Sequence, residues 1–317
     1  MRLLASSLRP NASPVNRLAS PEKSGLPYAL GAHAFWGSMP LYLLLVQSVD
    51  PLEFIAWRVV FTLPLCVLFL AVTRGWTELR AVLRDRRAVL TLAASAAMVG
   101  VNWWLYVWAI HNGHIYAASL GYYILPLMMM LLGLVVLGEK LTRLQWWAVA
   151  LAGVGVGVLA VGALTTMWLS LSMAVTFGLY GLLRKTVKAG PLAGLTVETL
   201  VLMPVALGIV AMQWTTPEGP ALARGWDLAL AVAWSGPMTA VPLMWFATAA
   251  RRLPYTVMGF LQFSSPTIVF LLGLTVFGEK LKLAQLACYV LIWAAAALFT
   301  WELLRGHKTS EPGAAAT

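Results

Sequence analysis

The sequence predicts an all-α membrane protein with ten transmembrane helices, arranged as a five-plus-five inverted-topology repeat. Three observations predict it: an apolar composition, ten long apolar segments, and one block of sequence that occurs twice. Of the 317 residues, 60% are hydrophobic and only 11% are charged, and the mean hydropathy is +0.80. This composition lies outside the range of soluble globular domains, so lipid is the expected solvent for most of the chain.

The apolar segments have the length of transmembrane helices. About 18 to 24 apolar residues cross a hydrocarbon core of about 30 Å as a helix. We expect ten such helices, near residues 27–47, 52–72, 88–110, 115–137, 144–163, 167–184, 192–213, 227–249, 254–277 and 283–303.

The repeated block defines two halves of the chain. Residues Pro126 to Gln145 return 140 positions later as Pro266 to Gln285, with eleven of twenty positions identical. Each half contains five predicted helices, and because this number is odd the second half lies upside down relative to the first. The chain therefore divides into an N-terminal tail (1–24), a first repeat (25–164), a second, inverted repeat (165–304) and a C-terminal tail (305–317).

The distribution of the basic residues behind the net charge of +10 indicates the membrane topology, because these residues are concentrated in alternate loops. With the N-terminus inside, eighteen basic residues fall in inner segments and three in outer ones, Arg224, Lys280 and Lys282. This asymmetry predicts that both termini are cytoplasmic, and it disfavours a nucleic-acid partner. We expect a multi-pass protein of the bacterial inner membrane. We interpret residues 1–24 as a disordered cytoplasmic tail; an organellar transit peptide is the alternative.

The turn after the fourth helix carries a family resemblance. Its sequence, Gly138-Glu139-Lys140-Leu141 followed by Gln145, recurs after the ninth helix and resembles the EamA-type branch of the drug/metabolite transporter (DMT) superfamily. Within that branch, segments 33–37, 52–58 and 101–108 are similar to the RarD permeases. The resemblance covers about residues 25–304. It implies a permease with ten helices around a central cavity lined by helices 1, 3, 4, 6, 8 and 9.

The inverted repeat itself favours transport. Two similar halves that face opposite ways can exchange conformations, which gives inward-open and outward-open states of similar energy. We therefore expect a secondary transporter for a small organic solute, with no cofactor and with proton coupling as an option. A membrane enzyme is disfavoured because no nucleophile lies near a base and no ATP-binding loop occurs; a channel or scaffold subunit is the other alternative. Monomer and homodimer stay open.

Two ionisable residues occupy matched positions inside helices. Arg58 in the second helix corresponds to Glu198 in the seventh at the 140-residue offset. Because these helices enter from opposite sides, the two residues should lie roughly 10 Å or more apart along the membrane normal. We expect Arg58 to serve the outer half of the pathway and Glu198 the inner half, with Glu198 as the candidate for proton coupling. The alternative is that each side chain reaches its nearer interface and only shapes topology.

Polar stripes on the first, third and sixth helices supply further candidates. Their side chains recur at spacings of three or four residues and therefore share a helix face. Packing or interhelical hydrogen bonding is the alternative role for each. The substrate-binding candidates on these helices are His33, Trp36, Asn102, Tyr106, Thr176 and Tyr180, with Trp103 beside them.

The matched prolines Pro126 and Pro266 predict bends in the fourth and ninth helices. A proline frees the carbonyl four residues earlier, and transporters place ligand sites at such interruptions. We treat both prolines as hinges; a plain packing kink is the alternative. The candidates for lining the site beside them are Tyr122, Tyr123, Gln262 and Ser264.

The repeated Gly-Glu-Lys turns are expected to be structural. Gly138 and Gly278 can take the left-handed conformation that ends a helix, and Glu139 and Glu279 are expected to cap and shape the turns. His111 and His114 lie in a short loop without cysteine or carboxylate neighbours in sequence, so we predict no metal. Cys66 and Cys288 are expected to pack as small apolar side chains inside helices.

Overall fold

The computed structural model describes residues 25–278 and 280–308, all of whose regular structure is helical. The predicted N-terminal tail, Glu279 and most of the predicted C-terminal tail lie outside the described residues. The elements are α1 (Leu26–Leu43), η2 (Leu44–Val46), α2 (Pro51–Thr73), α3 (Trp76–Arg84), α4 (Arg86–His111), α5 (Ile115–Val135), α6 (Arg143–Ala160), η3 (Val161–Thr166), α7 (Met167–Thr186), α8 (Pro191–Gln213), η4 (Ala221–Ala223), α9 (Trp226–Ala233), α10 (Ser235–Arg252), α11 (Tyr255–Gln262), α12 (Ser264–Thr275) and α13 (Leu283–Lys308).

Ten helical segments of the described chain are long and apolar enough to cross a membrane, as the sequence predicts. The eighth segment combines α9 and α10, and the ninth combines α11 and α12. Helix α3 was not predicted; with 9 residues it is too short to span the bilayer. Because ten crossings return the chain to the side where it started, Leu26 and Lys308 lie at the same end of the bundle. We call this the inner end, following the predicted orientation, and the opposite one the outer end.

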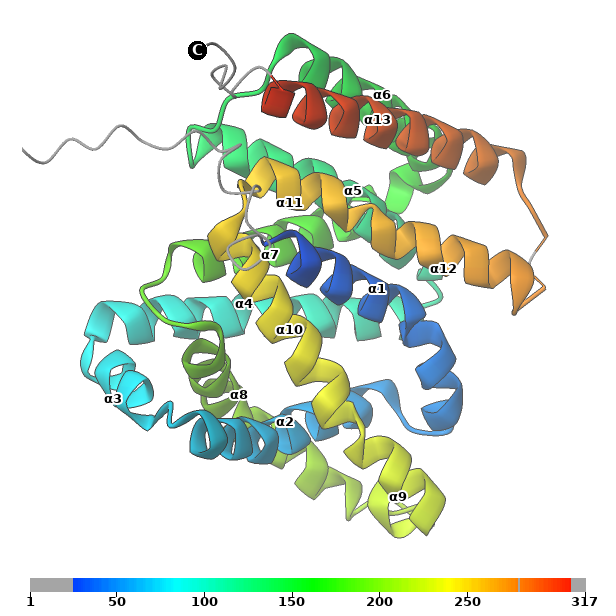
Figure 1. Cartoon of the computed structure of the whole chain (residues 1–317). Coiled ribbons are helices and arrows are strands. Elements are labelled where there is room, and N and C mark those ends of the chain that lie inside the picture. The colour runs from blue at the N-terminus through cyan, green and yellow to red at the C-terminus, as the bar shows by residue number, and fades with distance from the viewer. Residues whose placement is uncertain (1–24, 279, 309–317) are drawn as a thin grey trace, which may run out of the picture.

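The inverted repeat is visible in how the helices pack (Figure 1). Matched helices of the two halves lie against each other: α2 against α8, α5 against α11, and α6 against α13. The other main contacts come in corresponding pairs, since α1 packs on α10 and α12 while its counterpart α7 packs on α4 and α5. The first helix of each half therefore packs into the other half, and the interface between the halves runs through the whole bundle.

Helix starts follow from local capping residues. Asp50 precedes α2 and accepts hydrogen bonds from the N–H groups of Leu52 and Glu53, at 2.9 and 3.1 Å. Asp85 does the same for α4. The N-terminus of α6 has a complete capping box between Thr142 and Gln145, which explains the glutamine of the repeated motif.

The repeated turn connects the two halves physically. Gly138 and Gly278 have φ angles of 66° and 64°, which confirms the left-handed turns. Glu139 accepts hydrogen bonds from the N–H groups of Tyr255 and Thr256, at 2.6 and 2.8 Å, so it caps α11 of the opposite half and its capping role is confirmed. We call this contact the inner latch, because it holds α11 to the loop after α5 at the inner end.

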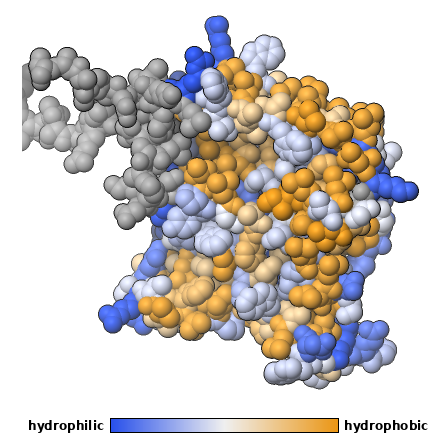
Figure 2. Space-filling view, turned by 45° about the vertical axis from the view of Figure 1, so that its right-hand side comes forward, coloured by the Kyte–Doolittle hydropathy of each residue, from blue (hydrophilic) through white to orange (hydrophobic). Residues whose placement is uncertain are grey.

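The surface matches a lipid environment. Figure 2 shows a face largely covered by hydrophobic residues, with strongly hydrophilic residues near the edges of the view. Large apolar side chains such as Val72, Val135 and Trp147 are 70 to 74% exposed, which is costly in water and ordinary against acyl chains. The two cysteines are buried in α2 and α13.

Candidate functional site

A small cavity lies at the centre of the bundle, between the two halves. Its volume is about 20 Å³, enough for one water molecule and far too little for an organic solute. The second, third, sixth, seventh and eighth helices line this small cavity; which helices line a solute-sized cavity stays a prediction. The lining residues are Val59, Thr62, Val99, Trp103, Tyr180, Leu195, Glu198, Thr199, Leu202, Thr239 and Leu243.

The inner part of this cavity carries the carboxylate of Glu198, which is 3% exposed. Ser95 of α4 donates a hydrogen bond to its Oε1 at 2.6 Å, and Arg184 Nε of α7 lies 3.6 Å from the same atom. A carboxylate in a membrane span is stabilised by such partners from other helices. Glu198 therefore links α8 to α4 and α7, and a change in its charge would act on both contacts.

Arg184 is the partner that sequence reasoning missed, because it was counted among the inner-loop basic residues that set topology. It lies in the last turn of α7 and is 1% exposed. Its Nη2 donates to the Pro191 carbonyl at 3.0 Å, and the guanidinium fills the space that a Cβ at position 194 would occupy. Gly194 thus makes room for the arginine, and the ion pair with Glu198 follows one turn later on α8.

Arg58 lies about 10 Å into α2 from its outer start. Its Nε donates to Thr239 Oγ1 at 2.9 Å, and its guanidinium carbon is 4.9 Å from the ring centre of Trp103 and 5.9 Å from that of Phe54. Thr239 and Trp103 also line the central cavity, so Arg58 borders it. Arg58 and Glu198 have separate partners, in agreement with the expectation that they do not pair directly.

An aromatic cluster adjoins the cavity between α1, α7 and α10. His33 is fully buried against Trp36 and Phe246, with ring centres 5.7 and 6.4 Å apart, and neither of its ring nitrogens has a hydrogen-bond partner. Tyr180 stacks on Phe246 at 6.1 Å. Of the ten substrate-binding candidates, Tyr180 is the one that reaches the cavity as described. His33 and Trp36 do not line the cavity; they contact Phe246, which in turn packs against Tyr180.

The candidates on α4 and α7 contact one another. The Asn102 amide donates to the Met173 carbonyl at 2.8 Å and to Thr176 Oγ1 at 3.1 Å, which joins α4 to α7. Thr176 also bonds back to its own helix at Ser172. Tyr106 packs edge-on against Tyr122 of α5, with ring centres 6.1 Å apart. In this conformation the Asn102 contact joins the two halves, whereas the Tyr106–Tyr122 contact lies within the first half.

The two matched prolines behave differently. Helix α5 runs without interruption through Pro126, whereas the ninth span breaks at Phe263, before Pro266. The ninth span is therefore divided near its proline, whereas Pro126 lies inside a continuous helix, and bends at the two prolines stay a prediction. At Pro126, α11 packs closely on α5, because a Cβ on Gly259 of α11 would lie 2.6 Å from the Pro126 carbonyl oxygen. This close backbone packing supports α5 there.

The remaining candidates lie around this break. Tyr123 and Tyr289 share a hydrogen bond, and Tyr289 donates to the Pro266 carbonyl at 2.8 Å. Gln262 is 3% exposed and its Oε1 has no hydrogen-bond partner. Ser264, at the start of α12, donates to the carbonyl of Leu261 in α11 at 2.6 Å, across the break.

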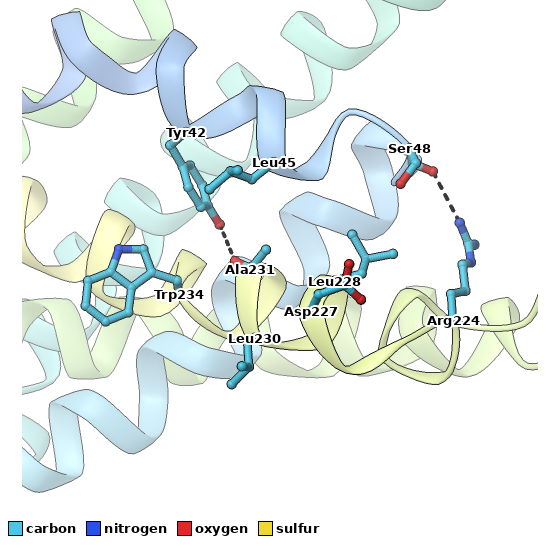
Figure 3. Close-up of a pocket in the computed structure, with 9 residues that line it drawn as sticks. All are labelled: Tyr42, Leu45, Ser48, Arg224, Asp227, Leu228, Leu230, Ala231 and Trp234. Carbon is cyan, nitrogen blue, oxygen red and sulfur yellow. Dashed lines mark hydrogen bonds between the residues drawn. The ribbon is translucent and has the colours of Figure 1, made fainter.

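A larger cavity of about 700 Å³ lies at the outer end, between α1, η2 and α9 (Figure 3). Tyr42 donates to the Ala231 carbonyl at 2.8 Å across it, and Arg224 donates to the Ser48 carbonyl at 3.3 Å. Its walls include Leu45 and Trp234, which are 65 and 61% exposed. Its walls come from both halves, so this groove lies at the outer end of their interface, and it shares no lining residue with the small central cavity.

A second buried acid, Glu53, anchors the outer loop beside that groove. It is fully buried and accepts hydrogen bonds from Trp57 Nε1 at 3.0 Å and from the Ala221 N–H at 2.6 Å, with Arg224 at 3.3 Å. Sequence reasoning did not single it out, because an acid in the first turn of a helix is common and does not by itself indicate burial. At the same end, His111 lies 3.5 Å from Asp50.

Comparisons with known proteins agree with this architecture. Residues 23–161 match the family model described as the EamA-like transporter family. The chain is 39% identical to protein RarD of Streptomyces exfoliatus over 289 residues, 91% of this chain and 92% of that protein. It is also 39% identical to an uncharacterized transporter of Pseudomonas aeruginosa over 307 residues, 92% and 98% of the two chains. A solved crystal structure with 15% identity superposes with a TM-score of 0.70, covering 89% of this chain and 98% of the other, and supports the fold alone.

Proposed function

Since the chain belongs to the EamA-like transporter family, we propose that it is a secondary transporter that moves a small organic metabolite or drug-like solute across the bacterial inner membrane by alternating access. The family and the ten apolar helices support a multi-pass membrane transporter of the DMT type. We propose the alternating-access mechanism, the class of solute and the cytoplasmic position of both termini.

The observation that carries the mechanism is the position of the central cavity. It lies where helices of both halves meet, the carboxylate of Glu198 lines it, and Arg58 borders it through Thr239 and Trp103. Transporters with inverted repeats bind their solutes at this place. At about 20 Å³ the cavity holds at most a water molecule, so a solute enters only when the halves move apart at one end.

The inner latch is the contact that this movement has to break at the inner end. Glu139 belongs to the first half and α11 to the second, so separating the halves there releases two hydrogen bonds from the first turn of α11. In sequence, Glu279 holds the corresponding place in the second half. An inverted repeat that alternates would use the two glutamates in turn, one in each state.

Glu198 is the proposed site of proton coupling. Its carboxylate is buried with Ser95 and Arg184, and protonation would weaken its attraction to Arg184 and free α7 relative to α8. The pair borders the cavity, so a bound solute and a bound proton would act on the same helices.

The test is counterflow in proteoliposomes across a panel of metabolites, with and without a pH gradient. The proposal expects saturable uptake of at least one solute that is stimulated by the same solute inside the vesicle. A channel gives flux without such trans-stimulation, and a membrane enzyme converts the solute; either result overturns the proposal. Uptake that Glu198→Gln leaves fully driven by the pH gradient removes Glu198 from coupling.

A further inference from the structure

The charges around the central cavity do not balance. Three ionisable side chains border it or pair beside it: Arg58, Arg184 and Glu198. Arg184 and Glu198 neutralise each other, which leaves the single positive charge of Arg58. A net charge within a membrane span is costly unless a counter-charge accompanies it.

No carboxylate of the described chain neutralises Arg58. The acid nearest to it along α2 is Glu53, which is already bound to Ala221 and Arg224. Within residues 25–278 and 280–308, the ion pairs involve other residues, and the guanidinium of Arg58 makes one hydrogen bond, from Nε to Thr239. The rings of Trp103 and Phe54 lie under it, and aromatic faces attract a cation without cancelling its charge.

The repeat shows what the site would bind. At the 140-residue offset, Ser95 corresponds to Ser235 and Glu198 corresponds to Arg58. In one of these matched places, the Ser95 hydroxyl donates to the carboxylate of Glu198. In the other, the Ser235 hydroxyl is fully buried and has no hydrogen-bond partner, while Arg58 occupies the sequence position that corresponds to the acid.

Ser235 also shares a face of α10 with Thr239, since the two residues are four positions apart. A hydroxyl and a guanidinium fork are the usual donors to a carboxylate. At the Glu198 site the chain itself supplies the carboxylate. At the Arg58 site the donors for a carboxylate are present, but the chain supplies no carboxylate.

We propose that the transported solute is an organic monoanion whose carboxylate binds Arg58 and Ser235, with an apolar or aromatic part against Trp103. This rests on the proposed function, because it specifies the solute of the same cavity. With Glu198 ionised and paired with Arg184, one negative charge on the solute neutralises the cavity, whereas a neutral solute leaves the charge of Arg58 unpaired and a dianion leaves an excess of negative charge.

The test is equilibrium dialysis of the full-length, detergent-solubilised protein against three matched pairs of acid and amide. The probes are indole-3-acetate and indole-3-acetamide, phenylacetate and phenylacetamide, and hexanoate and hexanamide. At least one acid should bind at least about tenfold more tightly than its amide, the scale of a charge-assisted hydrogen bond. If no acid binds more tightly than its amide in the wild-type protein, the proposal is overturned, and this comparison needs no variant.

Variants locate the site. Arg58→Gln should abolish the preference for the acid, Arg58→Lys should keep part of it, and Ser235→Ala should weaken acid binding severalfold without affecting the amide. Arg143→Gln, which removes an exposed charge at the start of α6, is the matched control and should change nothing. A preference that survives in Arg58→Gln, or that Arg143→Gln also removes, contradicts the assignment.

Binding by the solubilised protein does not require transport, so the two proposals fail separately. A protein that binds acids through Arg58 but shows no counterflow overturns the transport mechanism and leaves the anion site standing. Counterflow restricted to neutral solutes overturns the anion site and leaves the transporter standing.

Discussion

The inner latch gives the sharpest prediction. Replacing Glu139 by Gln keeps one oxygen acceptor, turns the other into an amide group that faces an N–H, and removes the negative charge at the start of α11. Glu139 accepts from Tyr255 and Thr256 at 2.6 and 2.8 Å, and the first turn of α11 has no side-chain cap of its own. Losing one charged hydrogen bond and weakening the other costs about 2 to 3 kcal/mol.

This magnitude converts directly into hydrogen exchange. The amides of Tyr255 and Thr256 exchange when the latch opens, so about 2 to 3 kcal/mol corresponds to exchange roughly 30- to 150-fold faster. The assay is mass spectrometry of a peptide that covers these two residues in reconstituted protein. The matched control is Lys140→Gln, an exposed neighbour in the same turn, which should leave the exchange unchanged.

Two results would refute the reasoning. Unchanged exchange of the two amides in Glu139→Gln means that the carboxylate does not hold α11. Faster exchange spread evenly over all ten spans means that the substitution destabilises the fold as a whole and does not open one end.

Three further predictions concern the core. Arg184→Leu leaves Glu198 buried without its counter-charge and should lower the free energy of unfolding by about 3 to 5 kcal/mol in thermal unfolding. Adding Glu198→Gln should recover most of this loss; losses that add up in the double variant would contradict an ion pair between the two residues. Gly259→Ala places a methyl group 2.6 Å from the Pro126 carbonyl and should cost about 1 to 3 kcal/mol, with a normal melting temperature as the contrary result. Pro126→Ala should slow counterflow and leave equilibrium binding of the solute unchanged; lost binding with unchanged turnover would argue against a hinge.

The features predicted well from sequence are those set by lipid and by local chain geometry. Ten spans follow from segment length, because a helix in a bilayer needs a minimum number of apolar residues. The left-handed glycines follow from the turn itself. The partner of Glu139 did not follow, since Tyr255 and Thr256 lie in the other half and only the packing of α5 on α11 brings them to the turn.

The candidate site was predicted less well, for a physical reason. Helix periodicity gives the face of a residue but not which helix that face meets. Asn102 lies on the predicted face, yet that face meets α7. Arg184 looked like a topology signal because basic residues at inner helix ends usually are, and its burial depends on Gly194, ten residues further on. The matched positions of Arg58 and Glu198 could be seen in the sequence. Their partners, Thr239 for Arg58 and Ser95 and Arg184 for Glu198, could be identified only from the structure.

The most direct measurement is the accessibility of the central cavity from each side of the membrane. A cysteine at Thr199, which lines the cavity, is introduced with Cys66 and Cys288 replaced by alanine, and is labelled in oriented vesicles with an impermeant maleimide. Alternating access predicts labelling from either side, with Glu139→Gln speeding it from the inner side and slowing it from the outer side. Labelling from one side only, or rates that rise on both sides together, would contradict the account.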